Sequence, residues 1–180
     1  PREAIDIGIA LVPEDRKNHG AMLEICVKNN INMPIYTKIS KASVISSKSE
    51  HKTAKKYKDE LYIKTPTLSQ LVKNLSGGNQ QKVILGKWLA ANSELIILDE
   101  PTRGIDVGAK FEIYKLMNDL VEQGKTILLI SSEMEELMGI SDRIIVLAEG
   151  KMTGELYKEE FSQDIIMRMA SAVGEEINEK

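Results

Sequence analysis

The sequence of 180 residues lacks several features that would each place it in a particular class of protein. Its single cysteine, Cys26, cannot form an internal disulfide bond, which gives weak support for a reducing, cytosolic setting. Its apolar runs, such as LIIL and TILLI, are far shorter than the roughly 20 residues that a membrane-spanning helix needs. The opening residues, PREAIDIGIA, do not show the basic-then-apolar order of a signal peptide. Any membrane role must therefore go through a partner.

A large excess of one charge is also absent. The formal net charge is −3, with 28% charged and 42% hydrophobic residues. A dedicated nucleic-acid binder is usually basic, so we expect no nucleic-acid partner. The length and apolar content instead predict a soluble globular protein with one sizeable core.

Strand-like and helix-like segments alternate along the chain. Short apolar runs predict strands over residues 8–12, 95–98, 126–130, 143–150 and 151–156. Apolar residues at helical spacing, together with capping signals, predict helices over residues 1–7, 24–33, 46–63, 77–91, 107–122, 133–139 and 163–173. Strands separated by helical crossovers indicate an α/β fold with a mainly parallel sheet and helices on its faces.

The stretch from residue 24 to residue 91 holds no clear strand. We therefore predict a helical subdomain over 24–92, set beside an α/β core portion made of 1–23 and 93–180. The polar residues PEDRKNHG, at 13–20, are predicted as a loop.

A pair of carboxylates follows the strand ELIIL. Asp99 and Glu100 lie at its carboxyl end, where open α/β sheets bind ligands, and Pro101 marks a turn. An Asp in this place can hold Mg²⁺ and an adjacent Glu can deprotonate an attacking water. The pair is equally compatible with an ordinary solvated strand end.

The stretch LSGGNQQ precedes a predicted helix. Ser76 stands at the N-cap, and Gly77 and Gly78 would let backbone N–H groups approach a ligand closely. The positive end of the helix dipole would then favour a phosphate. A helix start without any ligand explains the same residues, but not their pairing with ILDEPT one helix later.

Four motifs in order carry a family resemblance: VPEDRK, LSGGNQQK, DEPTRGIDVGAK and ISSEMEELMGISDRIIVL. LSGGNQQ followed by LIILDEPTRGID resembles the signature motif, Walker B strand and D-loop of the ATP-binding cassette (ABC) ATPases. The spellings are similar to the second, C-terminal cassette of monosaccharide importers of the ribose, galactose and xylose type. The resemblance covers nearly the whole sequence, from Pro1 to about Val173. It implies a P-loop NTPase fold of the ABC type.

The resemblance implies a role for each matching residue. Asp99 would bind Mg²⁺, and Glu100 would be the general base for ATP hydrolysis. Asp106 matches the D-loop aspartate that communicates between two ATP sites, although an N-cap role is equally compatible. The signature would clamp the γ-phosphate of ATP held by the opposite cassette. The residues that match the signature are Leu75, Ser76, Gly77, Gly78, Asn79 and Gln80.

The sequence departs from the family pattern in three places. No G-x-x-x-x-G-K-[ST] motif occurs, so the phosphate-cradling Walker A loop is missing from the chain. In the family this loop lies upstream of residue 1, which predicts an incomplete domain that is inactive alone. Glu14 stands where most cassettes place the glutamine that contacts Mg²⁺ and the transmembrane partner. Ser132 occupies the position of the switch histidine that contacts γ-phosphate, and with Glu135 it also spells a capping box.

The resemblance also implies cofactors, partners and location. ATP and Mg²⁺ are expected, with a second cassette and transmembrane permease subunits as partners and a periplasmic sugar-binding protein as an indirect one. The segment from Glu14 to Lys64 would face the permease. The protein would be cytoplasmic and peripheral on the inner face of the cell membrane, and the fragment alone prone to self-association through open sheet edges.

The intact signature and altered switch position together predict an asymmetric role. The chain would complete a competent ATP site on the partner cassette, while its own site turns over slowly or not at all. Two other functions stay open: a soluble ABC ATPase of translation or DNA repair, and a non-catalytic module that only docks on the permease or partner cassette. The spelling EPTRGID and the acidic balance disfavour the first, and Glu100 disfavours the second.

Overall fold

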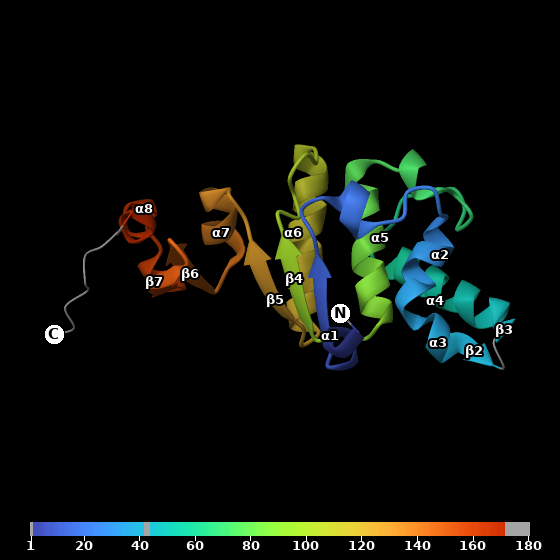
Figure 1. Ribbon diagram of the computed structural model, residues 1–180. Coiled ribbons are helices and arrows are strands. Elements are labelled where there is room, and N and C mark those ends of the chain that lie inside the picture. Colours follow the sequence, from blue (N-terminus) through green and yellow to red (C-terminus); the bar gives the residue numbers. More distant parts are fainter. Residues whose placement is uncertain (1, 42–43, 172–180) are drawn as a thin grey trace. The chain divides into compact units, whose positions relative to one another are not determined.

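Residues 2–41 and 44–171 are described by the structure, a computed structural model (Figure 1). The chain divides into two units, Pro1–Ile130 and Ser131–Lys180. This division differs from the predicted split between an α/β core portion and a helical subdomain, which stays a prediction.

The first unit is built on a parallel sheet. Its strands β1 (Ile9–Val12), β4 (Leu95–Asp99) and β5 (Thr126–Ile130) lie in the order β1-β4-β5. In the register, Val12 pairs with Leu98, and Leu98 pairs with Leu129. The predicted α/β fold with a parallel sheet is confirmed, and the predicted strands 8–12, 95–98 and 126–130 match these three strands within one residue.

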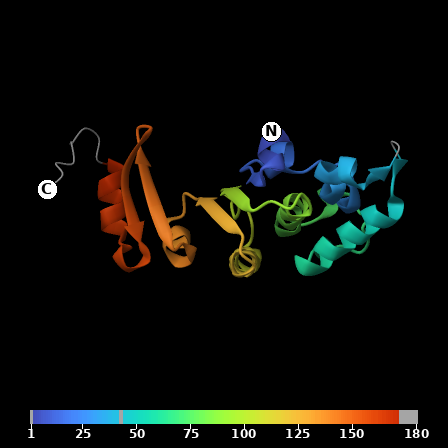
Figure 2. The ribbon, with the colours of Figure 1, turned by 90° about the horizontal axis from the view of Figure 1, so that it is seen from below.

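The two faces of this sheet differ in burial. Helices α5 (Gly77–Ala90) and α6 (Val107–Glu122) lie on one side of the sheet, as Figure 2 shows. Side chains alternate between faces along a strand, and Val12, Ile96 and Leu98 on one face are fully buried. Leu11 and Leu128, which share the opposite face in the register, are 49% and 46% exposed.

Helices dominate the stretch between β1 and β4. After β1 come a single π-helical turn (Arg16–Gly20), α2 (Val27–Asn32), a 3₁₀ turn (Met33–Ile35), α3 (Tyr36–Ile39), α4 (Ser47–Glu60) and a second 3₁₀ turn (Val72–Asn74). Helix α1 (Arg2–Asp6) precedes β1. Helix α2 packs against both α4 and α5, and its apolar residues Val27 and Ile31 are fully buried.

Two expectations for this stretch are wrong. Residues 13–20 do not form a plain loop, because the Asp15 side chain accepts hydrogen bonds from the N–H groups of Lys17 and Asn18 and starts the π-helical turn. The stretch also contains strands, since β2 (Ser40–Lys41) and β3 (Val44–Ile45) form a short antiparallel pair. At two residues each, these strands are too short for period-two alternation to reveal them.

The second unit is a hairpin with a helix on either side of it in sequence. It contains α7 (Met134–Ile140), β6 (Arg143–Ala148), β7 (Lys151–Tyr157), a 3₁₀ turn (Lys158–Glu160) and α8 (Gln163–Ser171). Strands β6 and β7 are antiparallel, and both turn residues, Glu149 and Gly150, have positive φ values. The core of the unit is formed by Ile144, Val146, Leu156 and Ile166. The predicted end of the last helix, at residue 173, lies outside the described residues.

Candidate functional site

The carboxyl ends of β1 and β4 meet at one edge of the sheet. Because the strands are parallel and Val12 pairs with Leu98, Asp99, the last residue of β4, lies at the same edge as Glu14 and Glu100, which follow the two strands. The sequence predicted a turn at Pro101. The structure confirms it, because residues 101–104 form a turn, and Glu100 just before this turn has a φ of 46°, in the left-handed region. A non-glycine residue rarely adopts this conformation, which often accompanies functional strain.

Side-chain contacts join the segment that follows β1 to the loop that follows β4. The Arg16 guanidinium donates to the carbonyl oxygens of Arg103, at 2.7 Å, and Gly104, at 3.2 Å. The Arg103 guanidinium forms an ion pair with the Glu14 carboxylate. Sequence reasoning selected Glu14 but missed both arginines, because their pairing depends on which loops the fold brings together.

Helix α5 begins against the same loops. Ser76 is its N-cap residue, with an extended conformation, but the Ser76 side chain makes no capping hydrogen bond. A Cβ added at Gly77 would lie 3.1 Å from Arg16 Nη2, and one at Gly78 would lie 2.9 Å from the Ala109 Cβ. Gly78 is therefore required for close packing within the unit independently of any ligand, whereas a side chain at Gly77 would only displace the end of the Arg16 side chain.

The side-chain amides of Asn79 and Gln80 form hydrogen bonds within the first unit. Asn79 Oδ1 accepts from the Lys64 N–H at 2.7 Å, and Asn79 Nδ2 donates to Ser76 Oγ at 2.8 Å. Gln80 is 7% exposed, and its Nε2 donates to the carbonyl oxygens of Val72 and Leu75 at 3.2 and 3.3 Å. The predicted contact of Leu75, Asn79 and Gln80 with a nucleotide stays a prediction.

Helix α6 begins at the far end of the β4 loop. Asp106 is its N-cap, and its Oδ1 accepts a hydrogen bond from the Ala109 N–H at 2.9 Å. The ordinary capping role considered for Asp106 is therefore confirmed, while a role between two ATP sites stays a prediction.

Ser132 lies in the second unit, and its predicted capping box with Glu135 is wrong. Helix α7 has Glu133 as its N-cap. The neighbouring Ser131 Oγ accepts from the Glu133 N–H at 3.1 Å and is hydrogen-bonded to the Glu136 carboxylate. The serine that contacts a glutamate thus lies one residue before Ser132, and its partner Glu136 lies one residue after Glu135.

Carboxylate oxygens at the sheet edge suit a hard cation. Asp99 is half-buried, and Mg²⁺ is commonly held by one or two carboxylates together with water. Glu14 is already paired with Arg103, which leaves Asp99 as the better ligand. Over residues 2–41 and 44–171, no group of three or more His, Cys, Asp or Glu side chains gathers into an all-protein metal cage.

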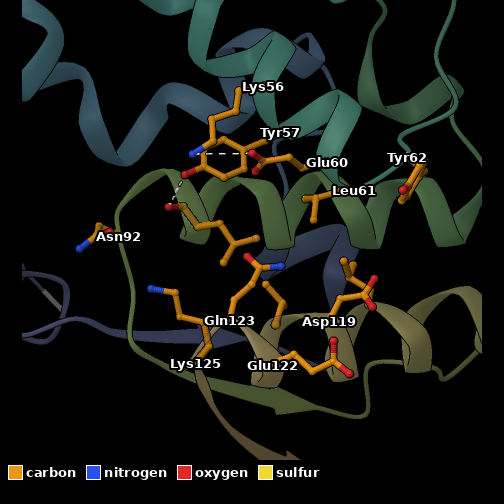
Figure 3. Close-up of a pocket in the computed structure, with 13 residues that line it drawn as sticks. Lys56, Tyr57, Glu60, Leu61, Tyr62, Asn92, Asp119, Glu122, Gln123 and Lys125 are labelled. Atoms are coloured by element: carbon orange, nitrogen blue, oxygen red, sulfur yellow. Dashed lines mark hydrogen bonds and ion pairs between the residues drawn. The ribbon is translucent and has the colours of Figure 1, made fainter.

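A pocket of about 810 Å³ lies in the first unit where α4, α5 and α6 end (Figure 3). Buried leucines line it, together with the carboxylates Glu60, Asp119 and Glu122. Helix carboxyl ends carry partial negative charge, so this pocket disfavours a phosphate. None of the site residues expected from the sequence lines it.

Within the described part of the chain, no helix is long and apolar enough to cross a membrane.

Sequence comparisons place these features in a family. The ABC transporter family model matches residues 2–103. The chain is 54% identical over 171 residues to the xylose import ATP-binding protein XylG of Thermoanaerobacter pseudethanolicus, covering 95% of this chain and 34% of that protein. It is 49% identical over 173 residues to the ribose import ATP-binding protein RbsA of Clostridium tetani, covering 96% of this chain and 34% of that protein. The chain thus spans about a third of the length of these curated relatives.

Solved structures show the same fold. The ADP conformation of MJ1267, an ATP-binding cassette of an ABC transporter, matches with a TM-score of 0.73 and 23% identity over 96% of this chain and 68% of that one. The dimeric post-hydrolysis structure of MJ0796, bound to ADP and Pi, matches with a TM-score of 0.69 and 23% identity over 85% and 64%. The family match over more than half of the chain agrees with this fold and with the motifs at the sheet edge. The chain belongs to the ABC transporter family.

Proposed function

We propose that this chain is part of the ATP-hydrolysing subunit that powers monosaccharide import through an ABC transporter. Relatives near 50% identity are xylose and ribose import ATP-binding proteins, which favours this role over translation or DNA repair. The observation that carries the proposal is the start of α5, where the Ser76 hydroxyl makes no capping bond beside the loop that follows Asp99 and Glu100. The proposed partners are a second cassette and membrane permease subunits, on the cytoplasmic side of the membrane.

The start of α5 would bind the γ-phosphate of ATP held by the opposite cassette. The Ser76 hydroxyl and the N–H groups of Gly77 and Gly78 can donate to phosphate oxygens, and the helix dipole favours the negative charge. Each charge-assisted hydrogen bond of this kind contributes roughly 1.5–3 kcal/mol. Neither glycine has a side chain that would obstruct the phosphate.

The carboxylates would serve the chain's own ATP site. Asp99 would hold Mg²⁺, which would neutralise charge on the phosphate oxygens when bound. Glu100, turned out of the strand by its positive φ, would accept a proton from the attacking water. The Ser132 hydroxyl cannot carry the positive charge of an imidazolium, which would weaken stabilisation of the transferring phosphoryl group. We therefore infer that the chain mainly completes its partner's site and that its own site is slow.

The test is ATP turnover by the assembled transporter with Ser76→Arg or Glu100→Gln. Arginine at position 76 would fill the space that a phosphate needs, so turnover should fall by roughly 100-fold or more. Glu100→Gln should leave most of the turnover. Ser69→Arg is the matched control, because Ser69 is another exposed serine and the added charge is the same; it should leave turnover unchanged.

Two outcomes would contradict the proposal. If Ser76→Arg hydrolyses ATP as fast as the unaltered transporter, the signature does not act on a phosphate. If Glu100→Gln is as damaging as Ser76→Arg, the chain's own site is catalytic and the asymmetric assignment is wrong.

A further inference from the structure

The Asn79 side chain bridges two fixed groups at the start of α5. Its Oδ1 accepts from the Lys64 backbone N–H at 2.7 Å, and its Nδ2 donates to Ser76 Oγ at 2.8 Å. A backbone N–H can only donate, so the amide atom that faces Lys64 must be the oxygen. The amide nitrogen must then face Ser76. The backbone of the loop before the signature therefore decides which way the amide points.

This orientation determines what the Ser76 hydroxyl can do. Its oxygen accepts a hydrogen bond from Asn79, and its side chain does not cap the helix. Within the part of the chain that the structure describes, no acceptor takes the hydroxyl hydrogen. A hydroxyl that already accepts one hydrogen bond becomes a better donor, because neighbouring hydrogen bonds polarise one another. The hydrogen is thus available to an anion outside the unit.

The Lys64 loop is in turn held by α6. Glu112 Oε1 accepts from Lys64 Nζ at 2.9 Å, and Glu112 Oε2 accepts from Lys82 Nζ at 2.8 Å. The Lys82 side chain is 5% exposed and the Glu112 side chain 44% exposed, so this second contact is partly desolvated, and it joins α5 to α6. The hydrogen bonds from Lys82 and Lys64 lower the pKa of Glu112 to about 2, which keeps the carboxylate charged near neutral pH.

We propose that Asn79 is a positioning residue that orients the Ser76 hydroxyl as a donor toward a phosphate oxygen, while Glu112 holds the Lys64 loop from which that orientation is set. This inference rests on the proposed function of the signature. It assigns Asn79 an action through Ser76, in place of the direct nucleotide contact expected from the sequence. The relay runs from the Lys64 N–H through the Asn79 amide to the Ser76 hydroxyl.

The test is a double-mutant cycle on ATP turnover by the assembled transporter, with Asn79→Ala made in three backgrounds. With Ser76 unaltered, Asn79→Ala should lower kcat about tenfold with little change in KM for ATP, because a charge-assisted hydrogen bond is lost at the phosphate. In the Ser76→Ala background, which is itself slowed about tenfold, Asn79→Ala should have almost no further effect. In the Ser76→Thr background, which keeps a hydroxyl, Asn79→Ala should again cost about tenfold.

The cycle separates failure of the relay from failure of the proposed function. If Asn79→Ala costs the same factor in all three backgrounds, Asn79 acts independently of Ser76 and the relay is wrong. If Ser76→Ala and Asn79→Ala leave turnover unchanged while Ser76→Arg abolishes it, the signature acts on ATP without an oriented hydroxyl, and the relay is again wrong. If Ser76→Arg also leaves turnover unchanged, the proposed function itself fails.

Discussion

Helices α5 and α6 begin side by side in the first unit, but the N-cap side chain hydrogen-bonds the free N–H groups in only one of them. Asp106 caps α6 with its own carboxylate, through the Ala109 N–H. Ser76 stands at the same position of α5 and makes no such bond, since its hydroxyl is turned toward Asn79. Asp and Ser are both good N-cap residues. The start of α6 is capped by its own side chain, whereas the start of α5 is left available to an anion.

The ion pair between Lys82 of α5 and Glu112 of α6 should give the largest change in stability when it is removed. Glu112→Gln should destabilise the chain by about 2 kcal/mol at neutral pH, because it leaves the buried Lys82 ammonium without an ionised partner. This loss is smaller than that expected for a fully buried ion pair, because Glu112 is 44% exposed. The folded pKa of Glu112, about 2, lies below its ordinary value of 4.5. Its stabilising effect is therefore fully present above pH 4.5 and is lost as the pH falls toward 2.

Urea unfolding of the native chain and of Glu112→Gln between pH 3 and pH 7 measures this difference. The two curves should converge as the pH falls. Lys64→Met is the control, because it removes only the exposed contact and should cost at most about 0.5 kcal/mol. A difference between native and Glu112→Gln that does not change with pH would show that the charge of Glu112 contributes nothing.

One methyl group added at Gly78 should disrupt the close packing between the starts of α5 and α6. An alanine Cβ at Gly78 would lie 2.9 Å from the Ala109 Cβ, which forces the helices apart. Overpacking costs about 1–3 kcal/mol, partly offset by about 0.5–1 kcal/mol from the better helix propensity of alanine, so we expect a net loss of about 1–2 kcal/mol.

Gly108→Ala is the matched control in α6. The nearest atom to its Cβ would be Asp106 Oδ1 at 3.4 Å, an ordinary contact, so this change should be neutral or stabilising. Thermal unfolding of both variants distinguishes the two cases. Equal stability of Gly78→Ala and Gly108→Ala would mean that the helix starts are not tightly packed.

Much of the fold could be predicted from the sequence because long periodic segments carry a strong local signal. Helix α6 spans residues 107–122 as predicted, with Asp106 as its cap, and β5 spans TILLI. The short β2 and β3 strands could not be predicted, because two residues show no periodicity. The start of α7 was predicted one residue early, because the capping-box spelling placed the N-cap at Ser132, whereas Glu133 is the N-cap.

The sequence selected candidate site residues, but it did not predict the hydrogen bonds and ion pairs that these residues make. Motif spelling selected Glu14 and the signature, yet Glu14 pairs with Arg103, which lies on a loop distant in sequence. Asn79 Oδ1 accepts a hydrogen bond from the backbone N–H of Lys64. Every residue except proline carries this group, so the sequence could not reveal which one Asn79 contacts. Such contacts depend on the tertiary packing of loops, which local patterns do not encode.

The difference between the two caps is tested most directly by removing each side chain in turn. Asp106→Ala should destabilise the chain by about 1 kcal/mol, because the Ala109 N–H loses its acceptor. Ser76→Ala should cost at most about 0.5 kcal/mol, since its hydroxyl does not cap the helix and the bond that is lost, from Asn79, is exposed. Asp106→Asn is the control, because an amide oxygen can still accept from Ala109 and should keep most of the stability. Chemical denaturation of the three variants measures these losses, and an equal loss for Ser76→Ala and Asp106→Ala would show that Ser76 also caps its helix. Its hydroxyl would then be committed to the helix, and the start of α5 would be closed in the same way as that of α6.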